Sequence, residues 1–91
     1  MDDVFDFKIG QVVISKAGRD KGFAFVITAI EQEYLYLVDG KTRPLENPKK
    51  KKARHVQPTK TVAMPDLTAN RQFLKNADFK AALKRFRACS H

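Results

Sequence analysis

Short runs of β-branched and aromatic residues dominate the first two thirds of the chain. The runs at 11–15, 23–31 and 34–38 each have the length and composition of a β-strand. Both alternating faces of the second run are largely apolar, one formed by Phe25, Ile27 and Ala29 and the other by Ala24, Val26, Thr28 and Ile30. Because a strand that is apolar on both faces is covered on both sides, this run is predicted to lie centrally in a sheet.

Turn residues separate these runs. The segment 16–22 contains Gly18 and Gly22, which can both take positive φ, and it is predicted to be the loop between the first two strands. Asp39-Gly40 follows the third run and is a strong hairpin signal.

Two further strands are expected after this hairpin signal. Residues 42–45 are predicted to form a short fourth strand, with Pro44 marking it as an edge, and residues 53–57 to form a closing strand. Five short strands joined by tight turns indicate a mainly β domain, a small closed or partly open barrel over residues 1–58.

The pattern changes to a helical one in residues 59–91, which are expected to form a C-terminal helical extension. Phe79, Ala82, Leu83 and Phe86 fall at i, i+3, i+4 and i+7, the apolar stripe of an amphipathic helix. Docking of this stripe on the barrel is expected, because an isolated helix of this length is marginally stable in water. The alternative is that the stripe folds against a partner. Phe73 is also expected to be a core or docking residue.

Positive charge is concentrated in the middle of the chain. The formal net charge is +8, and residues 41–60 hold eight Lys or Arg residues against one acidic residue. The run Lys49-Lys50-Lys51-Lys52 has only Glu46 nearby in sequence, so its side chains are expected to lie outside the core without an internal partner. A concentrated positive field attracts polyanions, and RNA, DNA and an anionic membrane all fit at this point.

The lysine run has three interpretations. Most such runs are solvated, flexible loops, and the segment 49–54 also resembles a nuclear localisation signal. The third interpretation, a polyanion-binding patch, is favoured by context. Lys41, Arg43, Arg54 and His55 flank the run on predicted strands, which would anchor the patch to a rigid domain.

The residues needed for catalysis or metal binding are scarce. His55 and His91 are the only histidines, and Cys89 is the only cysteine, which gives no zinc-ligand set and no cysteine–histidine pair. No phosphate-loop or dinucleotide motif occurs, so an enzyme, a metal, a cofactor or a small-molecule substrate is not expected. The acidic start lacks the features of a signal peptide, and no apolar run has the length of a membrane span. We therefore expect a cytoplasmic protein, monomeric when it has no partner, that does not bind membranes.

Tyr34 and Tyr36 share one face of the third predicted strand, opposite Leu35 and Leu37. On an exposed face a tyrosine can stack on a nucleotide base. Packing against the C-terminal helix is the equally acceptable alternative.

The segment from Gly10 to Gly22, GQVVISKAGRDKG, followed by an apolar strand, resembles a KOW motif. The match extends through Val38-Asp39-Gly40, Arg43-Pro44-Leu45 and the lysine run with His55-Val56. Together these segments resemble short bacterial KOW-domain RNA-binding proteins, relatives of the archaeal and eukaryotic large-subunit ribosomal protein of the fourteen-e type. The resemblance covers about residues 8–58. Phe23 departs from it, because this position is often basic in such proteins, and Phe25 stands where many carry a second glycine.

The resemblance implies an SH3-like five-stranded barrel of KOW type that binds RNA, often ribosomal RNA. With the basic block, it gives the candidate RNA-binding residues Lys16, Gly18, Arg19, Lys21, Gly22, Lys41, Arg43, Lys49, Lys50, Lys51, Lys52, Arg54 and His55. Because few of these side chains suit base-edge contacts, recognition is expected to depend mainly on phosphates and RNA shape. The alternative function is a protein-interaction module of SH3-like type in transcription or translation.

Overall fold

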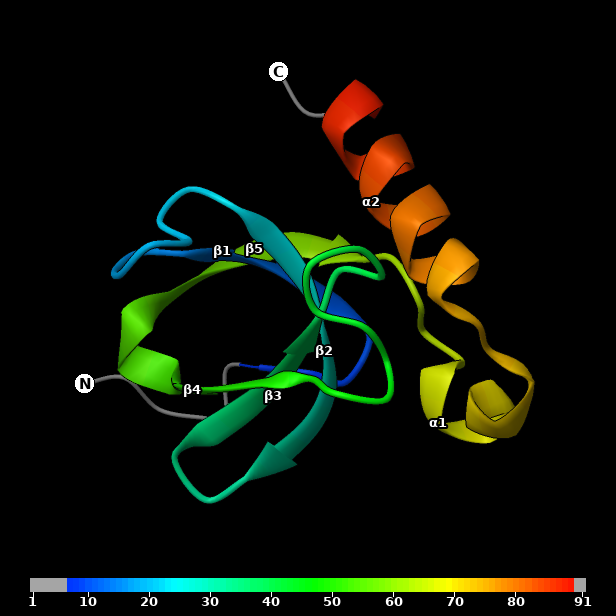
Figure 1. The fold of residues 1–91 in the computed structure, drawn as a ribbon, viewed down its shortest axis with the longest axis horizontal. Coiled ribbons are helices and arrows are strands. Elements are labelled where there is room, and N and C mark those ends of the chain that lie inside the picture. Colours follow the sequence, from blue (N-terminus) through cyan, green and yellow to red (C-terminus); the bar gives the residue numbers. More distant parts are fainter. Residues whose placement is uncertain (1–6, 90–91) are drawn as a thin grey trace.

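The computed structural model describes residues 7–89, which form a five-stranded antiparallel sheet followed by a C-terminal helical segment (Figure 1). The strands are β1 (Gln11–Ser15), β2 (Ala24–Glu31), β3 (Tyr34–Val38), β4 (Lys49–Lys52) and β5 (Val56–Val62). The helices are the 3₁₀ helix η2 (Ala53–His55), α1 (Leu67–Asn70), the 3₁₀ helix η3 (Arg71–Phe73) and α2 (Asn76–Cys89). The acidic N-terminal residues and His91 lie outside the described residues.

The strand order in the sheet is β4-β3-β2-β1-β5, so the predicted central position of β2 is confirmed. The edge strands β4 and β5 are consecutive in the chain and are joined by η2, so the sheet curls (Figure 1). Two backbone hydrogen bonds fix η2 at both ends: Ala53 N donates to Glu33 O at 2.8 Å, and Lys16 N donates to His55 O at 2.8 Å. The turn after β2 and the end of β1 therefore both contact η2.

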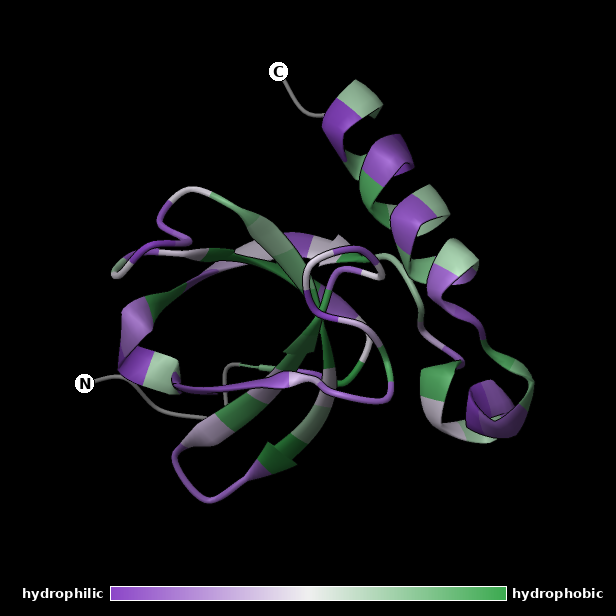
Figure 2. Cartoon of the chain, in the orientation of Figure 1, coloured by the Kyte–Doolittle hydropathy of each residue, from purple (hydrophilic) through white to green (hydrophobic). Residues whose placement is uncertain are grey.

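Two apolar clusters cover the two faces of the sheet, as the pattern of β2 predicts. The η2-side cluster is formed by Phe7, Val13, Phe25, Ile27, Leu35, Leu37, Ala53 and Val56. The helix-side cluster is formed by Val12, Val26, Val38, Leu67, Phe79 and Leu83. Figure 2 shows these apolar stretches along β1, β2 and β3 and on one side of α2, whereas β4 is hydrophilic.

The strict alternation predicted for β2 is interrupted at Thr28. The register with β3 shifts between Ile27 and Ala29, and Ile30 then packs against the same cluster as Ile27. A β-bulge inserts one unpaired residue and reverses the side-chain faces beyond it. The prediction that Ile30 shares the face of Val26 is therefore wrong. The guanidinium of Arg71 donates to the Thr28 carbonyl oxygen at 2.9 Å, which gives this carbonyl a partner.

The fourth strand is not where the sequence pattern placed it. Residues 42–45 lie in an irregular loop, because the Asp39 carboxylate accepts hydrogen bonds from the backbone N–H groups of Lys41 and Arg43, at 2.9 and 2.7 Å. The lysine run itself forms β4, and it pairs with β3. The predicted closing strand at 53–57 is instead η2 followed by β5, which continues to Val62.

The C-terminal helix packs on the sheet. Phe79, Ala82 and Leu83 are buried, and Phe86 packs against the helix-side cluster, so the predicted apolar stripe faces the sheet. The prediction for Phe73 is wrong, because this side chain is 71% exposed.

The loop after β3 fixes the start of this helix. The Asn76 side-chain oxygen accepts a hydrogen bond from Leu45 N at 2.7 Å. A Cβ on Gly40, which has φ of +80°, would clash with the Asn76 carbonyl oxygen. The side chain of Asp78 accepts a hydrogen bond from Lys75 N at 2.8 Å, as in one half of a capping box. Among residues 7–89, no helix is long and apolar enough to cross a membrane.

Candidate functional site

The loop between β1 and β2, residues 16–22, is the first part of the candidate site. Gly18 and Gly22 have φ of +83° and +89°, so the positive φ values predicted for both glycines are confirmed. Nothing lies within 4 Å of a Cβ built on Gly22, so the need for glycine there is conformational rather than a matter of space. The N–H of Gly22 donates to Ser15 O at 2.8 Å. It is therefore engaged within the protein and is not open to a phosphate.

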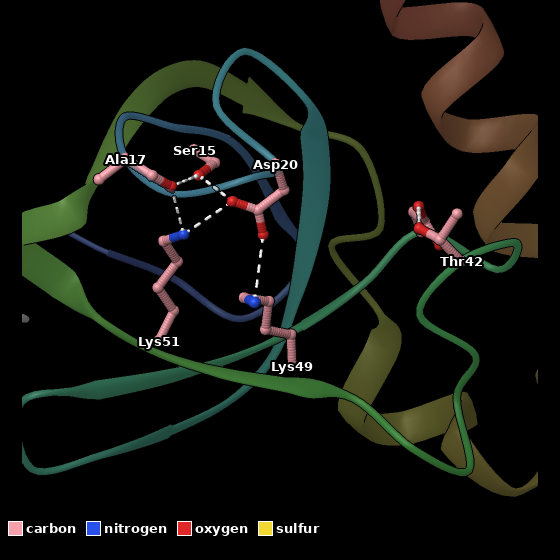
Figure 3. A network of polar contacts seen from close by, with 7 residues as sticks. Ser15, Ala17, Asp20, Thr42, Lys49 and Lys51 are labelled. Atoms are coloured by element: carbon pink, nitrogen blue, oxygen red, sulfur yellow. Dashed lines mark hydrogen bonds and ion pairs between the residues drawn. The ribbon is translucent and has the colours of Figure 1, made fainter.

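Asp20 in this loop binds two lysines of β4, as Figure 3 shows. Lys51 Nζ donates to Asp20 Oδ1 and to the Ala17 carbonyl oxygen, both at 2.8 Å. Lys49 Nζ lies 3.5 Å from Asp20 Oδ2. The Ser15 hydroxyl donates to Asp20 Oδ1 at 2.6 Å. The loop is thus attached to β4 through its one acidic side chain.

These contacts make the Asp20 carboxylate a stronger acid. Burial by itself raises the pKa of Asp20, but the hydrogen bonds from Lys51 and Ser15 and the charges of Lys51 and Lys49 lower it, to about 2. Hydrogen bonds and nearby positive charges favour the ionised form of a carboxyl group. Asp20 is therefore ionised throughout the physiological pH range and holds a fixed negative charge between the two lysines.

The lysine run consequently has an internal partner, and the prediction that it lies wholly outside the core is wrong. The Lys51 side chain is 9% exposed. Lys51 lies directly opposite Leu35 in the β3–β4 register, so its carbon chain shares the face of the η2-side cluster. The sequence pattern does not indicate this pair, because Asp20 and Lys51 are separated by 31 positions along the chain.

The other two lysines of β4 lie on its opposite face, with the tyrosines of β3. The register pairs Lys50 with Tyr36 and Lys52 with Tyr34. Lys50 Nζ lies 4.5 Å from the centroid of the Tyr34 ring, within the distance of a cation–π interaction. Lys52 Nζ lies 3.4 Å from a carboxylate oxygen of Glu33. This outer face therefore combines aromatic rings with cations, and Lys50 is exposed.

The remaining predicted residues divide into two groups. Arg54 is exposed on η2, and His55 is half-buried beside it. The hydrogen bond between Lys16 N and His55 O joins η2 to the 16–22 loop, whose side chains at Lys16, Arg19 and Lys21 are exposed. We group these residues with the lysines of β4 under the name loop-side basic surface; within it, Lys50 and Lys52 project from the face of β4 opposite the one bound to Asp20.

Lys41 and Arg43 belong to the other group, in the loop that follows β3. The carboxylate of Asp39 organises this loop and also accepts a hydrogen bond from the Thr42 hydroxyl at 2.6 Å. Burial raises the pKa of Asp39, but the hydrogen bonds from Thr42, Arg43 and Lys41 lower it below its ordinary value. The loop faces α2, and Lys41 lines a groove together with basic residues of that helix. The structure thus separates the thirteen predicted residues into a loop-side set and a pair near α2.

This groove contains residues that the sequence analysis did not assign to a site. It has a volume of about 640 Å³, and its lining includes Phe23, Phe86, Lys41, Lys80, Lys84 and Arg87. Phe23 is 55% exposed. The position of α2 relative to Phe23 depends on tertiary packing, so the sequence pattern alone does not indicate this groove.

The chain was compared with known proteins. No model of a known protein family matches the sequence, and no curated protein matches it significantly. The resemblance to KOW-domain proteins therefore remains a prediction from the motif residues. Within residues 7–89, no group of three or more His, Cys, Asp or Glu side chains is arranged to hold a metal ion.

Proposed function

We propose that the protein is a cytoplasmic RNA-binding protein whose curled sheet closes as an SH3-like barrel of KOW type. The fold class is supported by the five antiparallel strands and by η2, which joins the two edge strands and contacts β1 and the β2–β3 turn. A closed sheet has no open edges, and closure suits a domain with such short strands. The RNA partner is proposed to be ribosomal RNA or the ribosome.

The distribution of ion pairs on the loop-side basic surface is the observation that carries this proposal. Asp20 pairs with both lysines that face inward, Lys49 and Lys51, and offsets one of their two positive charges. Five cations remain exposed, and none of them forms an ion pair with a described carboxylate: Lys16, Arg19, Lys21, Lys50 and Arg54. The protein thus presents positive charge from a loop, a strand and η2 that are fixed to one another by hydrogen bonds.

Such a surface suits the phosphate backbone of RNA. Lysine and arginine side chains that neutralise phosphates release condensed counterions, and this release supplies most of the sequence-independent affinity. Because the backbone segments that carry these cations are fixed to one another, the backbone does not have to be ordered when the cations bind. Recognition through phosphate spacing and RNA shape follows from this arrangement.

The salt dependence of binding tests the proposal. Contact with about six phosphates predicts a slope of log K against log salt of about −4, as for single-stranded nucleic acid. Filter binding with total ribosomal RNA over a series of salt concentrations measures it, and co-sedimentation with ribosomes at low and high salt tests the partner. A slope near zero would exclude electrostatic binding. Absence of RNA binding at low salt would instead favour a protein-interaction module, for which the exposed Phe73 is a candidate contact.

A further inference from the structure

A groove between the sheet and α2 borders the loop-side basic surface, because Gly22 at the end of the 16–22 loop is part of its lining. Its walls come from four segments: β1, the end of the β1–β2 loop with the start of β2, the loop after β3, and α2. Its apolar lining is formed by Ile14, Phe23, Ala24, Leu83 and Phe86, and its basic lining by Lys41, Lys80, Lys84 and Arg87. The volume of about 640 Å³ falls in the range of roughly 300–1,000 Å³ that is typical of small-ligand sites.

Phe23 is the feature of this groove that points to a ligand. The residue is 55% exposed, although its backbone N–H and carbonyl groups are both held by hydrogen bonds. Phe23 N donates to Asp20 O at 2.9 Å, and Phe23 O accepts a hydrogen bond from Ser15 N at 3.0 Å. A rigid backbone that holds an aromatic ring in contact with solvent is what a stacking platform requires.

The charges around the groove decide the class of ligand. Four cations line it, against the single carboxylate of Asp39, whose two oxygens accept hydrogen bonds from Lys41, Thr42 and Arg43. The net field is therefore positive, and an apolar peptide would leave it uncompensated. A ligand with a flat apolar group between anionic groups complements both the rings and the cations.

We propose that this groove binds one unstacked nucleotide of a single-stranded RNA segment, with the base on Phe23 and the flanking phosphates on Lys84 and Arg87. The inference rests on the proposed function, and it adds a site for single strands to a surface that recognises phosphates. Single-stranded segments are the RNA form whose bases can be splayed out and stacked on aromatic side chains. A structured RNA with a loop would then contact the loop-side surface through its helix and the groove through its loop.

The chain provides a matched control for each part of this site. Phe73 is exposed like Phe23, but it lies on η3, outside the groove. Arg85 follows Lys84 in α2, and it lines a different depression, between α1 and α2. Comparing Phe23→Ala with Phe73→Ala, and Lys84→Ala with Arg85→Ala, therefore keeps the kind of side chain or its charge constant and changes only its position.

The experiment measures the fluorescence anisotropy of two labelled RNAs, oligouridylate and a perfectly paired RNA duplex, with each variant. Phe23→Ala is expected to weaken oligouridylate binding roughly 5- to 150-fold, because the loss of one base stacked on an aromatic ring reduces affinity by about this factor. The same variant should change duplex binding little, because the bases of a duplex are not available for stacking on Phe23. Phe73→Ala should leave both affinities unchanged. The double variant Lys84→Ala with Arg87→Ala should reduce the salt slope for oligouridylate by about 1.4, since two phosphate contacts are lost. Circular dichroism confirms that each variant is folded.

The outcomes separate this inference from the proposed function. If the wild type binds both RNAs and the Phe23→Ala and Phe73→Ala variants bind them with equal affinities, the proposed nucleotide site in the groove is wrong and the proposed function still stands. Equal effects of Lys84→Ala and Arg85→Ala would do the same, independently of the phenylalanine variants. No binding of either RNA by the wild type would overturn both proposals.

Discussion

The two faces of β4 give the same residue type two different roles. On one face, Lys51 is buried and donates to Asp20, and Lys49 lies beside the same carboxylate. On the other face, Lys50 is exposed over a tyrosine ring, and Lys52 contacts a carboxylate on the surface. The side chains of a strand alternate between faces, so β-sheet register alone decides which lysines stabilise the fold. A count of charges in the run therefore overstates the surface available to a polyanion.

Replacing one lysine on each face is the strongest test of this comparison. Lys51→Ala is expected to lower the free energy of unfolding by about 2–3 kcal/mol, because Asp20 and the Ala17 carbonyl both lose a charged donor. Lys50→Ala should change it by less than about 0.5 kcal/mol, as for most surface substitutions. Urea unfolding followed by circular dichroism measures both. Equal losses from the two variants would contradict the assignment of the faces.

A second substitution at the buried position separates charge from packing. Lys51→Met keeps most of the carbon chain against the η2-side cluster and removes the ammonium group. A stability between those of Lys51→Ala and the wild type is expected. A Lys51→Met protein as stable as the wild type would show that the ion pair adds nothing to the stability of the fold.

The inward face should also make stability depend on pH, through Asp20. Its pKa falls from 3.8 to about 2 in the folded protein, so the folded state binds fewer protons than the unfolded state in this range. The stabilisation is complete above about pH 5 and is lost as the pH falls toward 2. This stabilisation amounts to at most about 2.5 kcal/mol. The stability difference between the wild type and Asp20→Asn should therefore shrink as the pH is lowered from about 5 to 2.

Other carboxylates titrate in the same range, so only the difference between the two proteins is informative. Asp39 also has a lowered pKa, and it keeps its hydrogen bonds in the Asp20→Asn variant. Its contribution therefore cancels when the two unfolding curves are compared at each pH. A difference that stays constant across this range would show that Asp20 contributes through hydrogen-bond geometry alone.

Local patterns were sufficient to predict three strands and the long helix. The β-branched runs at 11–15, 23–31 and 34–38 became β1, β2 and β3, and the stripe from Phe79 to Phe86 became the buried face of α2. In each case the side chains that form the element also form the core. The spacing of the apolar residues along the chain therefore indicates both the type of element and its buried face.

The features that were missed depend on residues far apart in sequence. Four lysines have little intrinsic preference for a strand, and β4 forms because it pairs with β3. The bulge at Thr28 leaves no signal in the alternation of β2. The basic groove requires α2 to lie against the start of β2, and neither segment shows this alone. For the same reason, the candidate RNA-binding residues could be chosen by charge, but those facing inward could not be distinguished.

The smallest expected effect concerns RNA binding by the outward face. Lys50→Ala should reduce the slope of log K against log salt by about 0.7, the value of one phosphate contact on a single strand. The affinity should fall by a similar factor for RNAs of different sequence, because a phosphate contact carries no sequence information. Filter binding with ribosomal RNA measures both quantities.

Lys52→Ala is the internal reference for that measurement, because it removes a charge of the same sign from the same face. Its ammonium lies 3.4 Å from Glu33, so binding a phosphate would have to compete with this carboxylate, and a smaller change in slope is expected. Equal changes for Lys50→Ala and Lys52→Ala would indicate that the RNA senses only the total charge of this face. A larger change for Lys50→Ala would show that the contribution of each lysine to RNA binding depends on whether it already has a carboxylate partner in the folded protein.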